Sequence, residues 1–271
     1  FKLNKVEHTK HLQYLYPIYY KLKPYFTGNK NFDLRPHVIK EIVGQCDLLL
    51  PNSREELLHL CRHTGKKISK VERKAEVVFN AIDETKFYKD EEMAKKVKEE
   101  IGIDKFVLQV GRICPNKNQL RTVIACESIG VPLLIVGSGD GPYAQNLKKK
   151  SKKLEHVYVK DRVTQEKLRG IYSAAHTHIL PSLRESPGLV SLEAAVCGCE
   201  IVVSSDNFCP VSTYFDGYAH VCNPYSIASI KSKLLSSFNQ CLNSAEYRHK
   251  ISTDFTWSKT AKNTLSAYKK L

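Results

Sequence analysis

The sequence predicts an α/β protein built on a parallel β-sheet with helices on both faces. From residue 106 onward, short apolar segments alternate with helical stretches of ten or more residues. This alternation is typical of a parallel sheet that is covered on both sides. With 271 residues and a hydrophobic content of 42%, the chain is also long enough to bury a sizeable core.

Six segments are expected to form strands, because each is a short apolar run bounded by turn residues. They are Phe106 to Val110, Leu133 to Val136, His156 to Val159, His178 to Leu180, Glu200 to Ser204 and Tyr218 to Cys222. The charged segment 83–103 has few large apolar residues, so we expect a connection between domains that contains a helix. The closing segment 243–271 carries the only Trp and is expected to be helical.

The most informative stretch is residues 184–196, where a loop is expected to lead into a helix. Ser186 fits an N-cap, and Pro187 fits the first helical position, where its missing N–H costs nothing. The first free backbone N–H groups would lie at the positive end of the helix dipole, where a diphosphate can bind. These groups belong to Gly188, Leu189 and Val190.

Two carboxylates flank this expected helix start. Glu185 precedes it and could meet a sugar, whereas Glu193 lies roughly 9 Å along the helix axis from Pro187. That distance is comparable to the one between a pyrophosphate and the hydroxyls of its ribose. Two Glu residues at this spacing are weak evidence alone, since a solvated Glu193 and a helix-capping charge on Glu185 would explain them equally.

A second motif places two cations after an apolar strand. Arg112 and Lys117 follow the run 105–110 and lie five residues apart. At the carboxyl end of a parallel strand, the Arg fork can bind phosphate oxygens while Lys supplies a point charge, so the pair could offset a diphosphate leaving group without a metal ion. An exposed basic loop is the alternative.

A third motif is the glycine-rich turn 137–141, which follows the apolar run 133–136. Its pattern is neither the dinucleotide fingerprint nor a P-loop. We interpret it as one wall of a sugar pocket, with Gly137 allowing close approach of a ligand, and a plain tight turn is an equal alternative.

Together with further segments, these motifs occur in the order that is found in retaining glycosyltransferases of family 4 (glycosyl transferases group 1), and the chain resembles that family. The resemblance covers most of the sequence and implies the GT-B fold, which consists of two Rossmann-like domains. The matching pieces are residues 46–53, 77–83, Gly111-Arg112 with Lys117, 136–139, 185–193 and 255–258.

The resemblance implies a role for each motif residue. Arg112 and Lys117, beside Gly111, would bind the donor diphosphate, and Glu193 would hold the ribose hydroxyls. Glu185 would contact the transferred sugar and stabilise the transition state. The loop at Arg162 and Val163 would contact the base, and His8 would face the sugar, although a solvated histidine near a terminus is the simpler interpretation of His8.

As a whole, the resemblance implies a hexosyltransferase of class EC 2.4. It would move a sugar from a nucleotide-diphosphate sugar to a glycan or lipid-linked acceptor, in the synthesis of polysaccharide, lipopolysaccharide or glycolipid, with no metal and no further cofactor. Thr213 departs from the family pattern, because the family commonly has Glu at this position. Another GT-B enzyme, such as a nucleotide-sugar epimerase or a phosphorylase, is the alternative.

The same resemblance predicts the domain organisation. Residues 1–82 would form part of an N-terminal acceptor-side domain, 83–103 the connection, 104–242 the Rossmann-like donor domain, and 243–271 a helix that crosses back to the first domain. Because the sequence begins with Phe and holds only one complete Rossmann-like domain, we expect it to be the carboxyl-terminal part of a longer protein. A donor-binding fragment without activity is therefore an alternative.

The formal net charge of +14 exceeds what an anionic donor requires. We expect attraction to an anionic membrane surface, since segment 10–26 mixes basic and aromatic residues as interfacial segments do. A lysine-rich solvated surface is the alternative, and nucleic-acid binding is disfavoured because no recognised nucleic-acid-binding signature accompanies the charge. Nine cysteines without zinc-site spacing indicate reduced thiols and a cytoplasmic protein, peripheral at most to the inner face of the membrane.

Overall fold

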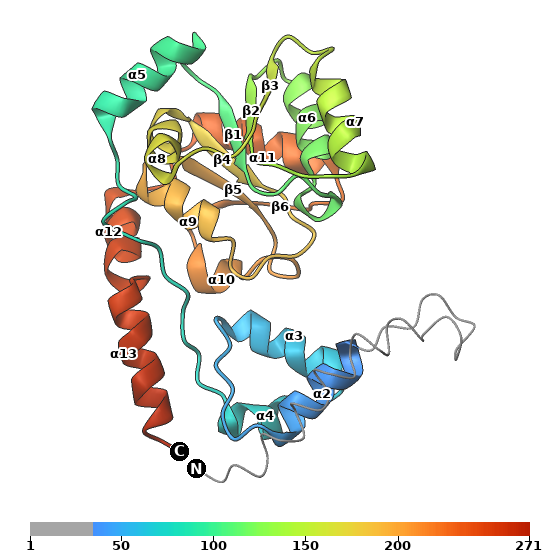
Figure 1. The fold of residues 1–271 in the computed structure, drawn as a ribbon, viewed down its shortest axis with the longest axis vertical. Helices are drawn as coiled ribbons and strands as arrows, with labels where there is room; N and C mark the ends of the chain where they lie inside the picture. Colours follow the sequence, from blue (N-terminus) through green and yellow to red (C-terminus); the bar gives the residue numbers. More distant parts are fainter. Residues whose placement is uncertain (1–34) are drawn as a thin grey trace, which may run out of the picture.

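The structure, a computed structural model, describes residues 35–271. Its centre is a six-stranded sheet in which every neighbouring pair of strands is parallel, in the order β3-β2-β1-β4-β5-β6 (Figure 1). The predicted α/β class is therefore confirmed, and the expected strands lie within two residues of the observed ones. These are β1 (Val107–Val110), β2 (Leu133–Val136), β3 (Val157–Lys160), β4 (Thr177–Leu180), β5 (Glu200–Ser204) and β6 (His220–Cys222).

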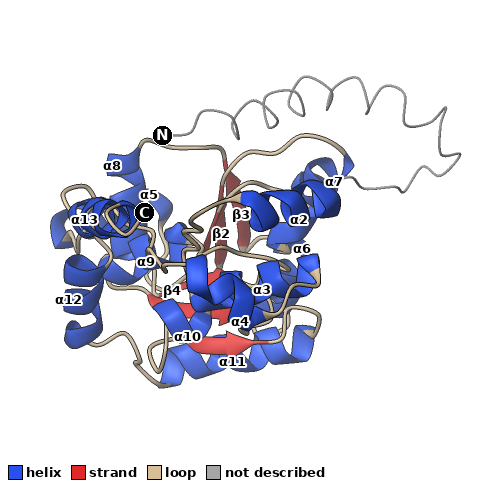
Figure 2. Ribbon diagram, turned by 90° about the horizontal axis from the view of Figure 1, so that it is seen from below, coloured by secondary structure: helices blue, strands red, loops and turns tan. Residues whose placement is uncertain are grey.

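Helices cover both faces of the sheet (Figure 2). Successive strand residues point to opposite faces, so each face has its own buried cluster. Leu108 and Val110 belong to one buried cluster, whereas Val107 belongs to the other. The first face is covered by α5 (Glu91–Ile101), α8 (Gln165–Ala174), α9 (Leu189–Val196) and α12 (Ala245–Asp254). The second is covered by α6 (Gln119–Glu127), α7 (Pro142–Ser151) and α11 (Ile227–Asn239).

The strand order reverses at β1, which pairs with β2 on one side and with β4 on the other. Loops that leave β1 and β4 at their carboxyl ends therefore turn toward helices on different faces. In open parallel sheets, the crevice formed at such a reversal is the usual place for a ligand. The loops that follow residues 110 and 180 are therefore the expected ligand-binding loops.

A smaller unit precedes the sheet. It contains α2 (Arg35–Gln45), α3 (Arg54–Thr64), α4 (Ile68–Val71) and the 3-10 helix η2 (Glu72–Lys74). Val43, Leu57, Cys61 and Val71 form its core. Two extended segments run parallel there, since Glu76 N donates to Leu49 O at 2.9 Å and Val78 N donates to Pro51 O at 2.9 Å.

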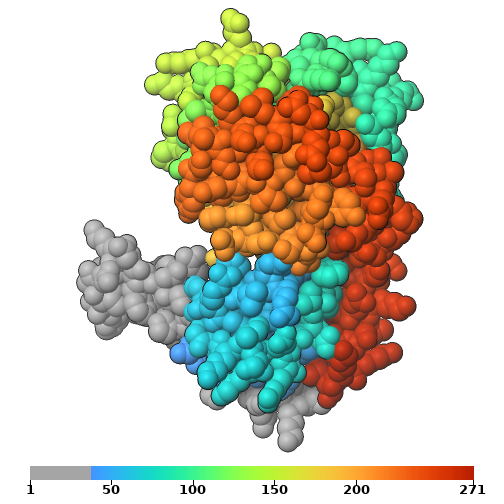
Figure 3. All heavy atoms as spheres, turned by 180° about the vertical axis from the view of Figure 1, so that it is seen from behind, coloured from blue at the N-terminus to red at the C-terminus, as the bar shows by residue number. Residues whose placement is uncertain are grey.

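The closing helices run along one side of the molecule, with α12 beside the sheet and α13 (Trp257–Tyr268) beside the smaller unit (Figures 1 and 3). Ile82 N donates to Phe255 O at 2.9 Å, and the Thr260 hydroxyl donates to Phe79 O at 2.8 Å. The expected helical segment 243–271 is thus two helices, α12 and α13, separated where the chain pairs with Ile82. The division into domains at residues 82, 103 and 242 stays a prediction.

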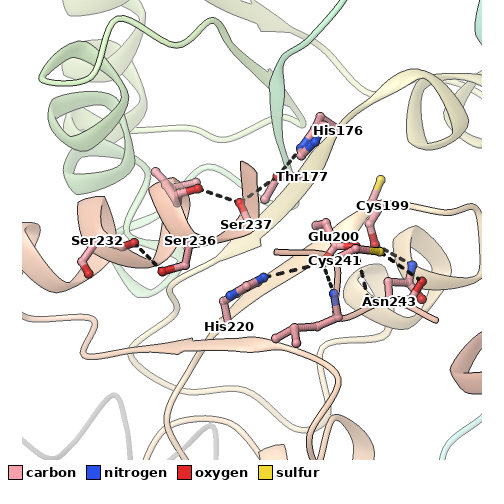
Figure 4. A network of polar contacts seen from close by, with 12 residues as sticks. His176, Thr177, Cys199, Glu200, His220, Ser232, Ser236, Ser237, Cys241 and Asn243 are labelled. Carbon is pink, nitrogen blue, oxygen red and sulfur yellow. Dashed lines mark hydrogen bonds and ion pairs between the residues drawn. The ribbon is translucent and has the colours of Figure 1, made fainter. Parts of the chain in front are cut away.

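A polar network holds the amino-terminal edge of the sheet (Figure 4). Glu200 begins β5, and its carboxylate accepts hydrogen bonds from Leu242 N at 2.9 Å and from the Cys241 thiol at 3.0 Å. It also lies 3.6 Å from Nε2 of the buried His220. Asn243 donates its side-chain amide to Ala195 O and Cys199 O, so this network fixes the start of α12 far from the carboxyl ends of the strands.

His8 and segment 10–26 lie outside the described residues. Within residues 35–271, no helix combines the length and the apolar character that crossing a bilayer requires.

Candidate functional site

An ion pair joins the loops that leave β1 and β4. Lys117, at the end of the 3-10 helix η3 (Pro115–Lys117), contacts Glu185 through its ammonium group. The two side chains are only 21% and 7% exposed, so the pair is largely removed from water. Each charge therefore depends on the other, and a ligand that engages one of them changes the environment of both.

Two buried side-chain amides, of Gln109 and Asn118, fix the loop that carries Lys117. Gln109, in β1, donates to Lys117 O at 2.7 Å. Asn118 adopts a left-handed conformation with φ of 63°, which Asn tolerates better than most residues. Its side-chain amide donates to Pro181 O at 2.9 Å and to Pro224 O at 2.7 Å, which ties the loop after β1 to those after β4 and β6.

The loop after β4 is held as firmly as the loop after β1. Leu183 N donates to Asn116 O at 2.8 Å, and the Asn116 side chain donates back to Arg184 O at 2.9 Å. Glu185 N donates to Phe208 O at 2.6 Å. These bonds leave the Glu185 carboxylate facing Lys117, so the structure brings together two of the predicted catalytic residues.

The predicted start of α9 was wrong by two residues. The helix begins at Leu189, and its N-cap is Gly188, whose φ of 82° is left-handed and cannot continue a helix. Ser186 is not the cap, because its hydroxyl accepts from the Asn52 amide at 2.6 Å and donates to Glu56 at 3.2 Å. Of the three residues in the diphosphate hypothesis, Leu189 and Val190 are the first two of the helix, whereas Gly188 is its N-cap.

Gly188 lies against the ion pair. A Cβ at this position would come 3.1 Å from a methyl group of Leu180 and 3.7 Å from Oε2 of Glu185. Because Gly188 has no side chain and tolerates a left-handed backbone, the start of α9 can lie beside the Glu185 carboxylate.

Arg112 follows Gly111, where a Cβ would lie 3.8 Å from the aliphatic stem of Lys117. Its side chain is exposed and forms no hydrogen bond or ion pair within residues 35–271. The Arg112 backbone is fixed by Gln119, which donates to Arg112 O at 2.9 Å. The guanidinium is therefore able to turn toward an anion beside Lys117.

The glycine-rich turn has a packing role that its residue pattern does not reveal. A Cβ at Gly137 would overlap the carbonyl oxygen of Gly111, and one at Gly139 would overlap that of Ile113. Ile113 N also donates to Ser138 O at 2.8 Å. These glycines thus allow the loop after β2 to pack closely on residues 111–118, the loop after β1 that we call the cation loop. Contact of Gly137 with a sugar stays a prediction.

Glu193 lies one to two turns into α9, half-buried beneath the site. The Tyr172 hydroxyl, from α8, donates to Glu193 Oε2 at 3.2 Å. Burial raises the pKa of Glu193, and the hydrogen bond from Tyr172 opposes this increase. A carboxylate whose pKa is raised by burial beside a candidate site is a candidate functional group.

Arg162 and Val163 follow β3 at the same edge of the sheet, and β2 separates that strand from β1. Arg162 is exposed, and Val163 is half-buried against the core. The structure does not bring them into contact with the ion pair, so their role in binding a base stays a prediction. Within residues 35–271, no three His, Cys, Asp or Glu side chains converge as metal ligands would.

The smaller unit closes over the loop of Glu185 through α3. Besides the contacts of Ser186 with Asn52 and Glu56, the Thr213 hydroxyl donates to Glu55 at 2.6 Å. A Glu at position 213, as in the family pattern, would face the Glu55 carboxylate, so Thr213 suits this chain. A small pocket, with about 40 Å³ open to water-sized molecules, lies between α3 and these loops and has Glu185 in its wall.

Sequence reasoning missed Tyr172 and a second buried residue, His178. His178 is fully buried in β4, where its ring packs edge-on against Tyr172 at 5.9 Å between centroids. The only signal in the sequence was a polar residue inside an apolar strand. Most such residues have structural roles, so spacing alone could not single it out.

The chain is similar in sequence to a described family and to curated proteins. Residues 90–254 match the family described as glycosyl transferases group 1. The chain is 27% identical over 240 residues to a D-inositol 3-phosphate glycosyltransferase of Mycobacteroides abscessus, a match that covers 84% of this chain and 53% of the relative. The chain thus spans about half the length of this curated relative.

Solved structures show the same fold at low identity. Sucrose-phosphate synthase of Thermosynechococcus elongatus aligns with a TM-score of 0.75 at 18% identity, covering 92% of this chain and 64% of that one. HepE of Anabaena, in complex with UDP and glucose, aligns with a TM-score of 0.75 at 15% identity, covering 89% and 68%.

The burial of Glu193 leads to a stability prediction. Replacing Glu193 with Gln keeps an acceptor for Tyr172 and removes a buried charge, so we expect the variant to be about 1 kcal/mol more stable than the wild type at pH 7. The raised pKa fixes the pH dependence. The folded state binds this proton more tightly than the unfolded state, so Glu193 favours folding at low pH and loses that contribution as pH rises through its folded pKa.

Urea unfolding between pH 4 and pH 8 would measure the effect. The advantage of Glu193→Gln should shrink toward acidic pH, and the exposed Glu127→Gln should change stability by less than about 0.5 kcal/mol throughout. A Glu193→Gln variant that is less stable than the wild type at pH 7 would show that the carboxylate stabilises the fold.

Proposed function

The chain belongs to the glycosyl transferases group 1 family, and on this basis we propose that it carries the donor site of a retaining glycosyltransferase. The family resemblance and the GT-B fold predicted from the order of motifs are both confirmed. The complete enzyme would move a sugar from a nucleotide-diphosphate sugar to a hydroxyl group of an acceptor, with the anomeric configuration kept.

The observation that carries the proposal is the convergence of Lys117, Glu185 and the start of α9. A diphosphate at this helix start would accept hydrogen bonds from Leu189 N and Val190 N and would meet the cation of Lys117, with Arg112 free to turn toward it. Its negative charge would also replace Glu185 as the partner of Lys117. The Glu185 carboxylate would then be available to the sugar.

The chemistry follows from this arrangement. As the bond from the anomeric carbon to the diphosphate breaks, negative charge grows on the leaving oxygen, and positive charge grows on the sugar. Lys117, Arg112 and the helix dipole would stabilise the first, and Glu185 the second. Glu193, further along α9, would hold the ribose hydroxyls. HepE of Anabaena, which binds UDP and glucose, supports a nucleotide sugar as the donor class.

Calorimetric titration of this chain with nucleoside diphosphates and nucleotide sugars, without metal, tests the proposal. We expect saturable binding of one diphosphate and a loss of at least about a hundredfold in affinity in an Arg112→Ala, Lys117→Ala double variant, since each of the two charged contacts contributes about 1.5–3 kcal/mol. A Lys149→Ala, Lys152→Ala double variant removes two exposed cations from the region of α7 and serves as the control. Equal affinities for the three proteins would contradict the assignment.

We also propose that the acceptor is a glycan or lipid-linked molecule reached at an anionic membrane surface. The net charge of +14 supports this, as does the outer face of α13. Trp257, Leu265 and Tyr268 fall on one side of that helix and are 60%, 56% and 55% exposed. Lys262 and Lys269 flank them, and residues 257–271 contain no acidic side chain, a composition typical of interfacial helices.

Sedimentation with liposomes that contain anionic lipid, at physiological salt, measures this attraction. We expect the wild type to pellet and a Trp257→Ser, Tyr268→Ser variant to pellet several-fold less, because its apolar anchors are gone. Tyr225→Ser, which removes an equally exposed aromatic ring elsewhere, should behave as the wild type. A wild-type protein that stays in the supernatant would sink the membrane hypothesis.

A further inference from the structure

A buried histidine lies beneath the site and takes no part in the chemistry proposed above. His178 is the second residue of β4, where it lies beside Leu108 of β1, and its side chain has no exposure to solvent. A polar ring in the middle of a parallel sheet is costly unless its nitrogens have partners. Both nitrogens of His178 have one.

The two partners fix the tautomer of the ring. Val110 N donates to His178 Nε2 at 3.4 Å, so this nitrogen carries no proton. The proton must therefore lie on Nδ1, which faces the Ser191 hydroxyl at 3.4 Å. Burial and the nearby Lys117 lower the pKa of His178 to about 3, so the ring stays neutral at physiological pH.

These partners belong to the two halves of the candidate diphosphate site. Val110 is the last residue of β1 and directly precedes Gly111 and Arg112, where the cation loop begins. Ser191 lies in the first turn of α9, and its own N–H donates to Gly188 O at 2.8 Å. The cation loop and the helix start come from strands that are neighbours in the sheet, and the His178 ring bridges them below the ion pair.

We propose that His178 is a positioning residue that sets the spacing between the cation loop and the start of α9. It touches neither donor nor acceptor, and it acts through Val110 and Ser191. The inference rests on the proposed function, because the spacing matters only to a ligand whose phosphates reach both halves. A ligand that lacks phosphates, such as a free nucleoside, would be indifferent to it.

The test compares ligands and substitutions. Once calorimetry has identified the preferred base, affinities for the nucleoside diphosphate and for the free nucleoside are measured in His178→Leu and His178→Gln. Leu removes both hydrogen bonds, and we expect at least a tenfold loss for the diphosphate with no change for the nucleoside. Gln can place its amide oxygen where Nε2 lies and accept from Val110 N, so we expect it to restore most of the diphosphate affinity.

A matched control separates positioning from stability. His220→Leu removes another buried histidine, which lies at the start of β6 in the network of Figure 4. It should destabilise the fold comparably while leaving diphosphate affinity unchanged. Nitrogen-15 NMR of the histidines provides a readout that does not depend on any ligand, because the His178 signals, identified by their loss in the Gln variant, should report a proton on Nδ1 and none on Nε2.

Several outcomes would overturn the inference. The first is that His178→Leu binds the diphosphate as tightly as the wild type does. The second is that His178→Leu loses affinity for the diphosphate and for the nucleoside equally, as partial unfolding would cause. A proton on Nε2 would also overturn it. A wild type that binds no nucleotide, but whose NMR spectrum shows the expected tautomer, would instead contradict the proposed function and leave the bridge between β1 and α9 intact.

Discussion

The ion pair between Lys117 and Glu185 is the interaction on which the candidate site depends. Two loops from neighbouring strands each present one charge that is largely removed from water, and in the absence of a ligand each charge is the partner of the other. The surrounding residues hold the two charged side chains in contact. Asn118 and Gln109 hold one loop, Asn116 joins it to the other, and Gly188 leaves room for the helix start beside the carboxylate.

Such a pair is well suited to binding an anion. An unliganded site that kept Lys117 and Glu185 unpaired would be destabilised, whereas the pair keeps both groups in place. In the proposed function, a diphosphate would exchange with the carboxylate as the partner of Lys117. The helix dipole of α9 and the exposed Arg112 add positive potential without requiring a metal ion. Two polar groups lie close to this site, the half-buried Glu193 and the fully buried His178, and burial shifts the pKa of each toward its neutral form.

Much of this arrangement could be predicted from the sequence. The six strands follow from short apolar runs, and the cations after residue 110 and the carboxylates at 185 and 193 follow from their spacing around strand ends. The start of α9 could not be predicted, because Ser186 has the composition of an N-cap and its hydroxyl is instead used by Asn52 and Glu56, which lie 130 or more residues earlier in the chain. Local patterns do not record such long-range partners.

Three other features escaped sequence reasoning for the same reason. Gly137 and Gly139 resemble a ligand-binding turn, yet their immediate neighbours are backbone carbonyls of the loop after β1. In the sequence, His178 looks like any other strand residue, because the partners of its two nitrogens come from other elements. The presence of Thr at position 213 is explained by its hydrogen bond to Glu55, which belongs to the smaller unit.

The most direct test of the donor site is a crystal structure of this chain with the nucleoside diphosphate that it binds most tightly. We expect the diphosphate to lie at Leu189 N and Val190 N, with the Lys117 ammonium turned from Glu185 toward a phosphate oxygen and the ribose hydroxyls near Glu193. A nucleotide bound elsewhere, or one that leaves the Lys117–Glu185 pair and the start of α9 untouched, would contradict the assignment.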